Sequence, residues 1–339
     1  MMTDKTRQIL FAARPSGQVK LSDFKLREIP LPSPSDGELL LRGCFLSLDP
    51  YMRGRMDDRE SYAKPLSVGD VMPGETVCVV EASHHPEYKP GDVVLAPSGW
   101  QTKFVCGSTG LRKVDTQVAP MSAYLGVLGM PGFTAYAGLR VIGKPVKGNT
   151  VVVSAAAGAV GSLAGQLATI AGARAVGIAG GPNKCAFVKE ELGFAAAVDY
   201  QATGFPEALA MACPDGVDVY FENVGGAVWQ AVLPLLNQFA RVPVSGIIAH
   251  YDGGHSSKGD LLPETMRQVI AKRLTLRGFI NYDFAAEYFP DFVRDVSAWL
   301  NEGRIHYREH IVDGLENAPK AFIGMLNGEN LGKALVRLP

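Results

Sequence analysis

Hydrophobic and polar positions follow two different patterns along the 339 residues of this chain. From residue 1 to about residue 125, short apolar runs such as ELLLRGCFLSL and ETVCVVEAS alternate with turns rich in Pro, Gly and Asp. Many short strands separated by turns are typical of a small β-barrel or sandwich. From about residue 126, apolar runs alternate with segments of helical spacing, which predicts a doubly wound parallel sheet of the α/β class.

The second pattern also predicts the order of the elements. Strands are expected at 151–155, 174–179, 196–199, 217–222, 240–248 and 274–280, and helices at 160–171, 183–192, 206–212 and 226–237. The C-terminal tail is mixed, with helices expected at 287–302 and 317–327 and strands at 305–312 and 333–337. We expect the tail to return partly to the first domain. The predicted domains are therefore 1–125 with 302–339, and 126–301.

The turn after the first strand of the second domain has the spacing of a dinucleotide-binding motif. In the run VVVSAAAGAVG at 151–161, Ala156, Gly158 and Gly161 occupy the three small positions, with Ala in place of the first Gly. Small residues let the backbone approach a pyrophosphate, and N–H groups at the start of the next helix bind the phosphates. This run therefore predicts a Rossmann nucleotide site.

The end of the second strand distinguishes between the two nicotinamide cofactors. An NAD-binding turn usually places Asp or Glu there, to accept hydrogen bonds from the ribose hydroxyls. Here the strand ends in Gly180 and Gly181, and Lys184 follows. Because a lysine attracts a 2′-phosphate that a carboxylate would repel, the sequence predicts NADPH rather than NADH.

Composition and charge argue against several classes of partner and location. The chain is 47% hydrophobic and 20% charged with a net charge of −1, so no charge surplus indicates nucleic acid or a membrane surface. The first residues, MMTDKTRQIL, lack the apolar core of a signal peptide, which predicts a cytoplasmic protein. Five isolated cysteines without a CxxC pair predict reduced thiols, with neither disulfides nor a zinc lobe. Polar residues interrupt the uncharged stretch around the dinucleotide turn, which disfavours a transmembrane helix.

Two further runs carry candidate chemistry, each with a structural alternative. SLDPYMRGRM at 47–56 is either a solvated surface loop or a substrate-facing loop that presents Tyr51. FENVGG at 221–226 follows the fourth strand of the sheet, so Asn223 is placed to bind a cofactor at the carboxyl end of that strand. Asn is also a good helix cap, and the two roles are compatible.

The run SGIIAHYDGGHSSKG at 245–259 leaves the fifth strand and places His250 and Tyr251 at the expected level of the nicotinamide. His250 and His255 lie in a loop without a nearby Cys or an HExxH helix, which argues against a metal site. A GxxxxGK run at 138–144 lacks the following Ser or Thr of a phosphate loop, and the absence of GxSxG argues against a serine hydrolase.

The order of these runs resembles one enzyme family over nearly the whole chain. SLDPYMRGRM, MPGFTAYAGL, AAAGAVGS, FENVGG and ENAPKAFIGMLNGENLGK are similar to segments of the zinc-independent medium-chain dehydrogenases/reductases. The resemblance is greatest to the alkenal/one oxidoreductases, which include leukotriene B4 12-hydroxydehydrogenases (prostaglandin reductases), plant double-bond reductases and bacterial NADPH-dependent curcumin reductases. It implies a GroES-like β-barrel substrate domain, a Rossmann domain inserted before its C-terminal part, and a homodimer.

The resemblance also implies which residues hold the cofactor. Lys184 and Tyr200 would bind the 2′-phosphate, Tyr251 would neighbour the nicotinamide ribose and the substrate carbonyl, and Tyr51 would line the substrate pocket. The other implied NADPH contacts are Ala157, Gly158, Ala159, Val160, Asn223, Ser245, Gly246, Ile247, Phe279, Ile280, Asn281 and Asn330. No metal is implied, because a zinc-bearing relative would carry Gly-His-Glu where this chain has PGE at 73–75.

The activity that the resemblance implies is NADPH-dependent reduction of the C=C bond of an α,β-unsaturated ketone or aldehyde. Hydride would add to the β-carbon, and the Tyr251 hydroxyl, the ribose 2′-hydroxyl or both would stabilise the enolate oxygen. Two alternatives stay open, an NADPH:quinone reductase on the same fold and a non-enzymatic NADPH-binding protein. The first would favour quinones over enones, and the second would bind NADPH without turnover.

Overall fold

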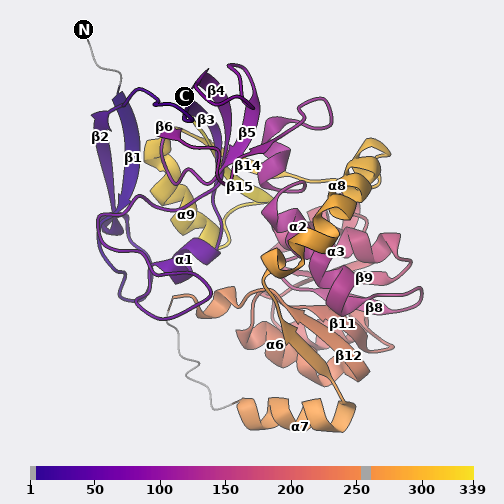
Figure 1. Ribbon diagram of the computed structural model, residues 1–339. Coiled ribbons are helices and arrows are strands. Elements are labelled where there is room, and N and C mark those ends of the chain that lie inside the picture. The colour runs from indigo at the N-terminus through magenta and orange to yellow at the C-terminus, as the bar shows by residue number, and fades with distance from the viewer. Residues whose placement is uncertain (1–4, 253–260) are drawn as a thin grey trace. The chain divides into compact units, whose positions relative to one another are not determined.

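The structure is a computed structural model that describes residues 5–252 and 261–339 (Figure 1). The chain divides into two compact units: the N-terminal unit, Met1–Leu125 with Glu309–Pro339, and the central unit, Gly126–Arg308. The second boundary follows Arg308 rather than residue 301, because the backbone of His306 exchanges hydrogen bonds of 2.7 and 2.9 Å with the side chain of Gln166. Residues 253–260, with His255 of the predicted loop, lie outside the described residues.

The described part of the central unit holds a six-stranded parallel sheet in the order β10-β9-β8-β11-β12-β13. Its strands are β8 (Thr150–Val153), β9 (Arg174–Ala179), β10 (Ala196–Asp199), β11 (Val217–Phe221), β12 (Leu236–Val244) and β13 (Thr275–Gly278). This is the predicted doubly wound sheet. The strand order reverses between β8 and β11, and ligands bind beyond the carboxyl ends of the strands at such a switch point.

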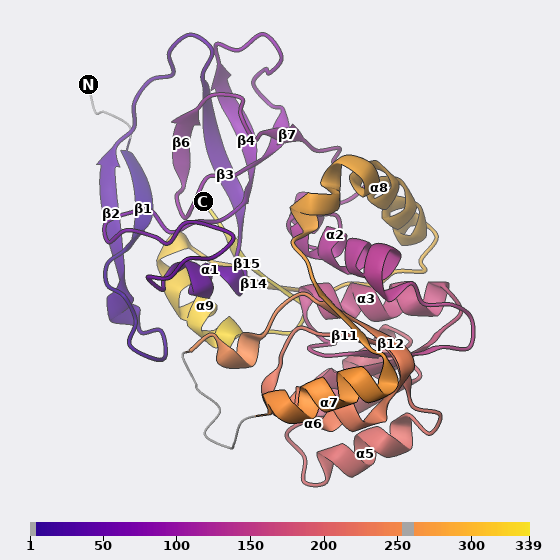
Figure 2. The ribbon, with the colours of Figure 1, turned by 60° about the horizontal axis from the view of Figure 1, so that its bottom comes forward.

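Helices cover both faces of this sheet (Figure 2). On one face lie α2 (Met130–Ala137), α3 (Ala159–Ile170) and α8 (Ala285–Asn301), and on the other α5 (Phe205–Ala212), α6 (Gly226–Val232) and α7 (Leu262–Lys272). The short helix α4 (Pro182–Ala186) follows β9 and packs against β10. Val152 and Val176 of the strands form one buried cluster with Leu209 of α5 and Val228 of α6.

Several element boundaries differ from those that the sequence predicts. The helix expected over 226–237 ends at Val232, because Pro234 lies in a 3-10 turn and Leu236 is buried at the start of β12. β12 ends at Val244, so the last four residues of the strand expected over 240–248 lie beyond it. The strand expected at 305–312 is β14 (Glu309–Asp313). Residues 51–55, expected in a turn-rich loop, form the short helix α1 (Tyr51–Arg55).

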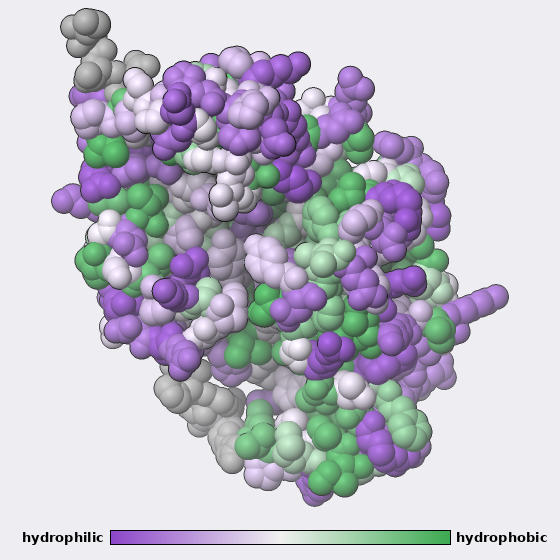
Figure 3. Space-filling view, viewed as in Figure 1, coloured by the Kyte–Doolittle hydropathy of each residue, from purple (hydrophilic) through white to green (hydrophobic). Residues whose placement is uncertain are grey.

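The sequence analysis missed α7, although apolar residues recur at helical spacing along it. Leu262, Met266 and Ile270 recur every four residues and are 60%, 46% and 77% exposed. Figure 3 shows apolar side chains gathered over α7. The next element, β13, is the last strand of the sheet, and all four of its residues are exposed. An apolar stripe beside an open sheet edge is typical of a surface that another chain covers.

The N-terminal unit is built on a mixed sheet in the order β14-β15-β3-β4-β5-β7, with β6 also paired to β3. Besides β14, its strands are β15 (Lys333–Arg337), β3 (Leu39–Ser47), β4 (Thr76–Ser83), β5 (Val93–Ala96), β6 (Lys103–Cys106) and β7 (Arg112–Lys113). A hairpin of β1 (Lys5–Phe11) and β2 (Phe24–Pro30) adds an antiparallel pair. Because β15 pairs antiparallel with β3 and parallel with β14, the C-terminal tail is part of this sheet.

The core of the N-terminal unit contains side chains from both ends of the chain. The ring centroid of Trp100 lies 5.7 Å from that of Phe24 and 5.6 Å from that of Phe322. Phe322 belongs to α9 (Ala318–Leu326), the helix of the C-terminal tail. All three rings are at most 9% exposed, so the tail contributes to the core as well as to the sheet.

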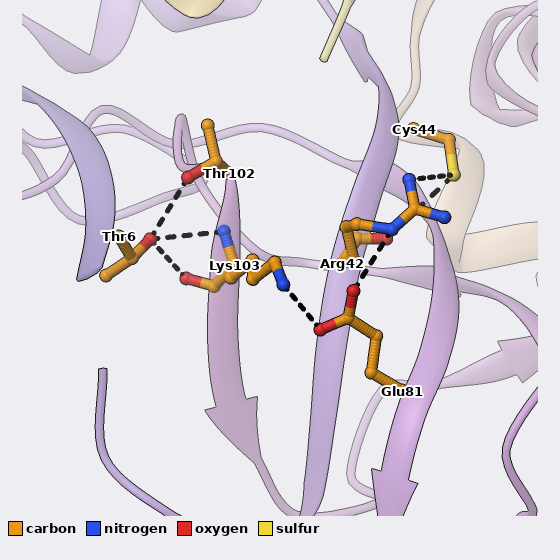
Figure 4. Close-up of polar contacts among 6 residues, drawn as sticks. All are labelled: Thr6, Arg42, Cys44, Glu81, Thr102 and Lys103. Carbon is orange, nitrogen blue, oxygen red and sulfur yellow. Dashed lines mark hydrogen bonds and ion pairs between the residues drawn. The ribbon is translucent and has the colours of Figure 1, made fainter. Parts of the chain in front are cut away.

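Polar contacts fix the hairpin and neighbouring strands of the same unit (Figure 4). The hydroxyl of Thr6 on β1 donates a hydrogen bond of 2.6 Å to the backbone carbonyl of Lys103 on β6. The carboxylate of Glu81 on β4 lies 2.7 Å from the Lys103 ammonium and 3.2 Å from the Arg42 guanidinium of β3. These contacts link four strands. The two ion pairs of Glu81 are partly exposed, so each adds little to stability by itself, whereas the Thr6 hydroxyl is buried.

Candidate cofactor site at the carboxyl ends of the central strands

The turn between β8 and α3 brings the backbone close enough to receive a pyrophosphate. Gly158 is the N-cap of α3, and no described side chain caps this helix end. A methyl group at Gly161 would lie 2.3 Å from the carbonyl oxygen of Ala155, so only Gly fits there. The first N–H groups of a helix lack intrahelical acceptors. Ala157, Gly158, Ala159 and Val160 therefore form a cradle of the kind that binds phosphates.

Ala156 takes the place of the first glycine of the motif without disturbing the turn. It is fully buried, and its N–H donates to the carbonyl of Ile178 on β9. The space for its methyl group comes from Gly177, where a methyl group would lie 2.8 Å from the Ala156 Cβ. The glycine at 177 thus compensates for the alanine at 156.

The end of β9 carries an acidic contact that the sequence analysis missed. Asp199, the last residue of β10, accepts hydrogen bonds of 2.8 and 2.9 Å from the backbone N–H groups of Gly181 and Gln201. Both bonds go to one carboxylate oxygen. Tyr200 is 45% exposed and lies against the strand end, since a methyl group at Gly180 would come within 2.9 Å of its ring. β9 itself ends without an acidic residue, as the sequence shows.

Lys184 lies on α4, the helix that follows this strand end. It is half-buried, and burial lowers the pKa of its ammonium group. Because α4 packs against β10, which precedes Tyr200, the structure keeps the two residues expected at the 2′-phosphate on adjacent elements.

Asn223 follows β11 at the switch point and is bonded to the end of β8. Its backbone N–H donates to the Ser154 hydroxyl, and its side-chain NH2 group donates to the Ser154 carbonyl, both at 2.8 Å. The N-cap of α6 is Gly225, without a capping bond from a described side chain. The prediction that Asn223 caps this helix is therefore wrong, and the interpretation as a residue at the ligand end of the sheet remains.

The segment after β12 folds back over this loop. Backbone N–H groups of Ser245 and Gly246 donate to the carbonyl of Glu222 at 2.9 and 3.2 Å. A methyl group at Gly246 would lie 3.2 Å from the hydroxyl oxygen of Tyr251. Burial raises the pKa of Tyr251, and a hydrogen bond from the backbone N–H of Ile247 partly opposes this. Five of the predicted contacts thus lie at the carboxyl ends of β11 and β12, namely Asn223, Ser245, Gly246, Ile247 and Tyr251.

Residues 279–281 follow β13, and two of them pack inward. Phe279 packs edge-on against Phe221, with ring centroids 6.4 Å apart. Asn281 is 7% exposed, and its NH2 group donates to Thr134 and to the Met130 carbonyl of α2 at 3.1 and 3.2 Å. The amide nitrogen of Asn281 is therefore used inside the protein.

In the N-terminal unit, Tyr51 begins α1 and packs half-buried against the core of that unit. Arg53 is 2% exposed, and its guanidinium donates to Asp57 at 2.6 Å and to the Gly17 carbonyl at 3.0 Å. The interpretation of this run as a loop of solvated charges is therefore wrong for Arg53. A buried arginine instead holds α1, and with it Tyr51, in place.

A buried ion pair lies directly before α1. The ammonium of Lys333 is 2.7 Å from the Asp49 carboxylate and 2.7 Å from the Leu48 carbonyl. Both charged residues are at most 5% exposed. The NH2 group of Asn330 donates to the Gly332 carbonyl at 2.7 Å, which shapes the turn before β15. The helix stop and closing strand that the sequence predicts here are both present.

The described residues contain neither a metal-binding cluster nor a helix that could span a membrane. No cluster of three or more His, Cys, Asp or Glu residues that could hold a metal occurs among them. No described helix is long and apolar enough to cross a membrane.

The sequence reasoning missed Glu222 as well as Asp199, although an acidic residue at the end of an apolar strand can be seen in the sequence.

Comparisons with known proteins extend over the whole chain. Residues 7–114 match the family described as the N-terminal domain of oxidoreductase, and residues 159–298 match the family described as zinc-binding dehydrogenase. NADPH-dependent curcumin reductase of Escherichia coli is 48% identical, over 98% of this chain and 97% of that protein. Prostaglandin reductase 1 of Bos taurus is 42% identical, over 93% of this chain and 94% of that protein.

The solved structures agree with these relatives. The crystal structure of CurA from Vibrio vulnificus in complex with NADPH superposes with a TM-score of 0.95 at 49% identity, over 98% of this chain and 99% of that one. Quinone oxidoreductase of Escherichia coli, at 17% identity and a TM-score of 0.77, shares the fold alone. This chain therefore belongs to the zinc-independent medium-chain dehydrogenases/reductases, in the group of the curcumin and prostaglandin reductases.

Proposed function

We propose that this protein uses NADPH to reduce the C=C bond of α,β-unsaturated ketones and aldehydes. The main support is the set of loops that converges at the switch point between β8 and β11. This arrangement occurs in a chain that matches curcumin, prostaglandin and 2-alkenal reductases over at least 93% of its length. The N-terminal unit would then be the substrate domain, with Tyr51 lining its pocket.

The residues at the strand ends fit the parts of NADPH. The cradle at the start of α3 would bind the pyrophosphate, and Lys184 and Tyr200 would bind the 2′-phosphate. Asn281 and Asn330 would contact NADPH through the side-chain carbonyl oxygen or the backbone, because the side-chain NH2 group of each already donates a hydrogen bond within the protein. The remaining proposed contacts are Asn223, Ser245, Gly246, Ile247, Phe279 and Ile280.

Bound NADPH would supply a hydride to the β-carbon of the substrate. Tyr251 would hold a proton opposite the substrate carbonyl, because a tyrosine hydroxyl is protonated at neutral pH, and burial raises its pKa further. Its oxygen accepts a hydrogen bond from Ile247, so its own O–H is available to an oxyanion. A donor placed where negative charge develops stabilises the transition state more than the ground state.

Steady-state kinetics test this function and the role of Tyr251 together. Purified protein should oxidise NADPH with a small enone, and the product should be the saturated ketone. Tyr251→Phe should lower kcat by about 10²- to 10³-fold, as for the loss of an oxyanion donor. Tyr88→Phe, whose ring packs on His85 in the N-terminal unit, is the matched control. Turnover with quinones alone, or NADPH binding without any turnover, would reject the enone reductase.

Cofactor choice has its own test. Lys184→Ala should raise the KM for NADPH about tenfold to hundredfold and leave the KM for NADH unchanged, because a charge-assisted hydrogen bond to the 2′-phosphate is lost. Lys189→Ala removes an exposed charge three residues after α4 and serves as the control. Equal effects on both cofactors would exclude Lys184 from the 2′-phosphate site.

We also propose a homodimer in the cytoplasm. The four exposed residues of β13 and the apolar stripe of α7 form a surface that a second copy would cover by pairing strand edges. Light scattering should give twice the mass of the chain, and Ile270→Lys should shift it toward the monomer. A monomeric unmodified protein would refute the dimer. The five free thiols fit a reducing compartment.

A further inference from the structure

A buried carboxylate lies directly after β11, where the proposed cofactor loops meet. Glu222 is 3% exposed. Its Oε1 atom accepts hydrogen bonds from the Tyr220 hydroxyl at 2.8 Å and from the backbone N–H groups of Val224 and Gly225 at 2.7 and 3.0 Å. The Ser154 hydroxyl lies 3.2 Å from the same oxygen. One oxygen therefore collects three donors, and the Ser154 hydroxyl, which also lies 3.1 Å from the Phe221 carbonyl, shares its proton between the two acceptors.

These donors and the backbone of Glu222 connect the ends of three strands. Ser154 follows β8, Val224 and Gly225 follow β11, and the Glu222 carbonyl accepts the N–H groups of Ser245 and Gly246 after β12. A carboxylate is costly to bury unless donors satisfy it. Here the donors to the side chain define the path of the backbone on either side of Asn223, and the backbone carbonyl of Glu222 holds the segment before Tyr251.

We infer that Glu222 is a positioning residue, which holds the loops around the nicotinamide half of NADPH without touching the reacting atoms. The inference rests on the proposed function, because that function places Asn223 and Tyr251 at the nicotinamide. Loss of the Glu222 carboxylate would leave three donors, those of Tyr220, Val224 and Gly225, unsatisfied inside the protein and would loosen the loop that carries Asn223. The segment before Tyr251 would follow through its bonds to the backbone carbonyl of Glu222. The adenosine half, bound at the ends of β9 and β10, would keep its contacts.

The same strand offers a matched control at its other end. Asp218 accepts a hydrogen bond of 2.8 Å from the N–H of Thr150 on β8 and one of 2.9 Å from the side chain of Asn237 on β12. It therefore links the same three strands as Glu222, but at the amino end of β11. If Glu222 only stabilised the fold, its removal, like that of Asp218, would lower stability and leave the ligand dissociation constants unchanged.

The experiment compares Glu222→Ala, Glu222→Gln and Asp218→Ala. Calorimetry measures the dissociation constants of NADPH and of adenosine 2′,5′-bisphosphate, which lacks the nicotinamide half, and steady-state kinetics measures kcat with an enone. We expect Glu222→Ala to weaken NADPH binding about tenfold and to lower kcat about tenfold to hundredfold, because small misplacements are costly in catalysis. Binding of the bisphosphate should change less than about twofold, within the scatter expected for a distant site.

The two remaining variants separate positioning from stability. Glu222→Gln should restore most of the NADPH affinity, because its amide oxygen can accept hydrogen bonds from the same donors. Asp218→Ala should lower the urea midpoint of unfolding without changing either dissociation constant. If Glu222→Ala does not fold, Glu222→Asp keeps the charge and withdraws the oxygen by one methylene, and it should show the same pattern to a smaller degree.

Three outcomes would overturn the inference. In the first, Glu222→Ala weakens the binding of NADPH and of the bisphosphate equally. In the second, Glu222→Ala and Glu222→Asp leave NADPH binding and kcat unchanged. In the third, Asp218→Ala changes binding and kcat in the same way as Glu222→Ala. Failure of the unmodified protein to reduce an enone would refute the proposed function instead. The two failures are therefore distinguishable.

Discussion

Replacement of Glu75 by Gln should change how the free energy of unfolding depends on pH. Glu75 precedes β4, in the segment where zinc-bearing relatives are expected to carry Gly-His-Glu. Burial and, after it, repulsion from Asp49 raise the pKa of Glu75 to about 7, against the attraction of Arg112 and Lys333. The folded protein therefore holds this carboxyl group in its uncharged form to a higher pH than the unfolded chain does.

The sign and size of the effect follow from the two pKa values. Well below pH 4.5, the group is protonated in both states and costs nothing. As the pH rises through 4.5 and then about 7, the unfolded chain releases the proton first, so the free energy of unfolding falls. From about pH 5 to about pH 8.5 this loss is about 2.5 kcal/mol. Gln does not titrate, so the Glu75→Gln variant escapes the loss.

Urea unfolding at a series of pH values measures this difference directly. The free energy of unfolding of Glu75→Gln, minus that of the unmodified protein, should grow with pH by the amount given above. Carbon-13 NMR of the labelled glutamates should show one carboxyl group titrating near neutral pH in the unmodified protein only. A difference that stays constant with pH, or one that falls, would refute the assignment of a raised pKa to Glu75.

Two further predictions concern packing at the cofactor turn and at α1. Gly161→Ala should raise the dissociation constant of NADPH more than about tenfold, because its methyl group would meet the Ala155 carbonyl at 2.3 Å. Gly107→Ala, with open space around it, should have no effect on binding, and equal affinities in calorimetry would refute the first expectation. Lys333→Met should lower the free energy of unfolding by about 3–5 kcal/mol, because Asp49 would stay buried without its partner. Lys113→Met, at a pair with Asp92 in which the lysine is 52% exposed, should cost at most about 1 kcal/mol, and a similar loss in both variants would contradict this reasoning.

Local patterns in the sequence were sufficient for the parts of the fold in which neighbouring residues determine the backbone. The run at 151–161 specifies its own turn, because small residues are needed within a few positions of one another. The alternation of strands and helices predicted the doubly wound sheet, since each element buries its own apolar face. Gly180, Gly181 and Lys184 indicated NADPH for a similar reason. They lie close together at one strand end, where a lysine and the lack of an acidic residue favour a 2′-phosphate.

Contacts between distant residues decided what the pattern could not show. The helix α7 was missed although its apolar residues recur at helical spacing, and only the tertiary structure shows that this apolar stripe is exposed. Arg53 looked like a solvated charge, yet the Gly17 carbonyl and Asp57 satisfy it in a buried position.

The same distinction applies to the candidate site. The sequence by itself determined which residue types stand at the strand ends, and the family resemblance indicated their roles. Only the tertiary structure decided that Glu222 is buried, because its donors come from β8 and β11, and that the Asn223 amide bonds to Ser154 rather than capping α6. A side chain's burial and charge depend on partners that are remote in sequence, and the chain brings these partners together only when the sheet forms.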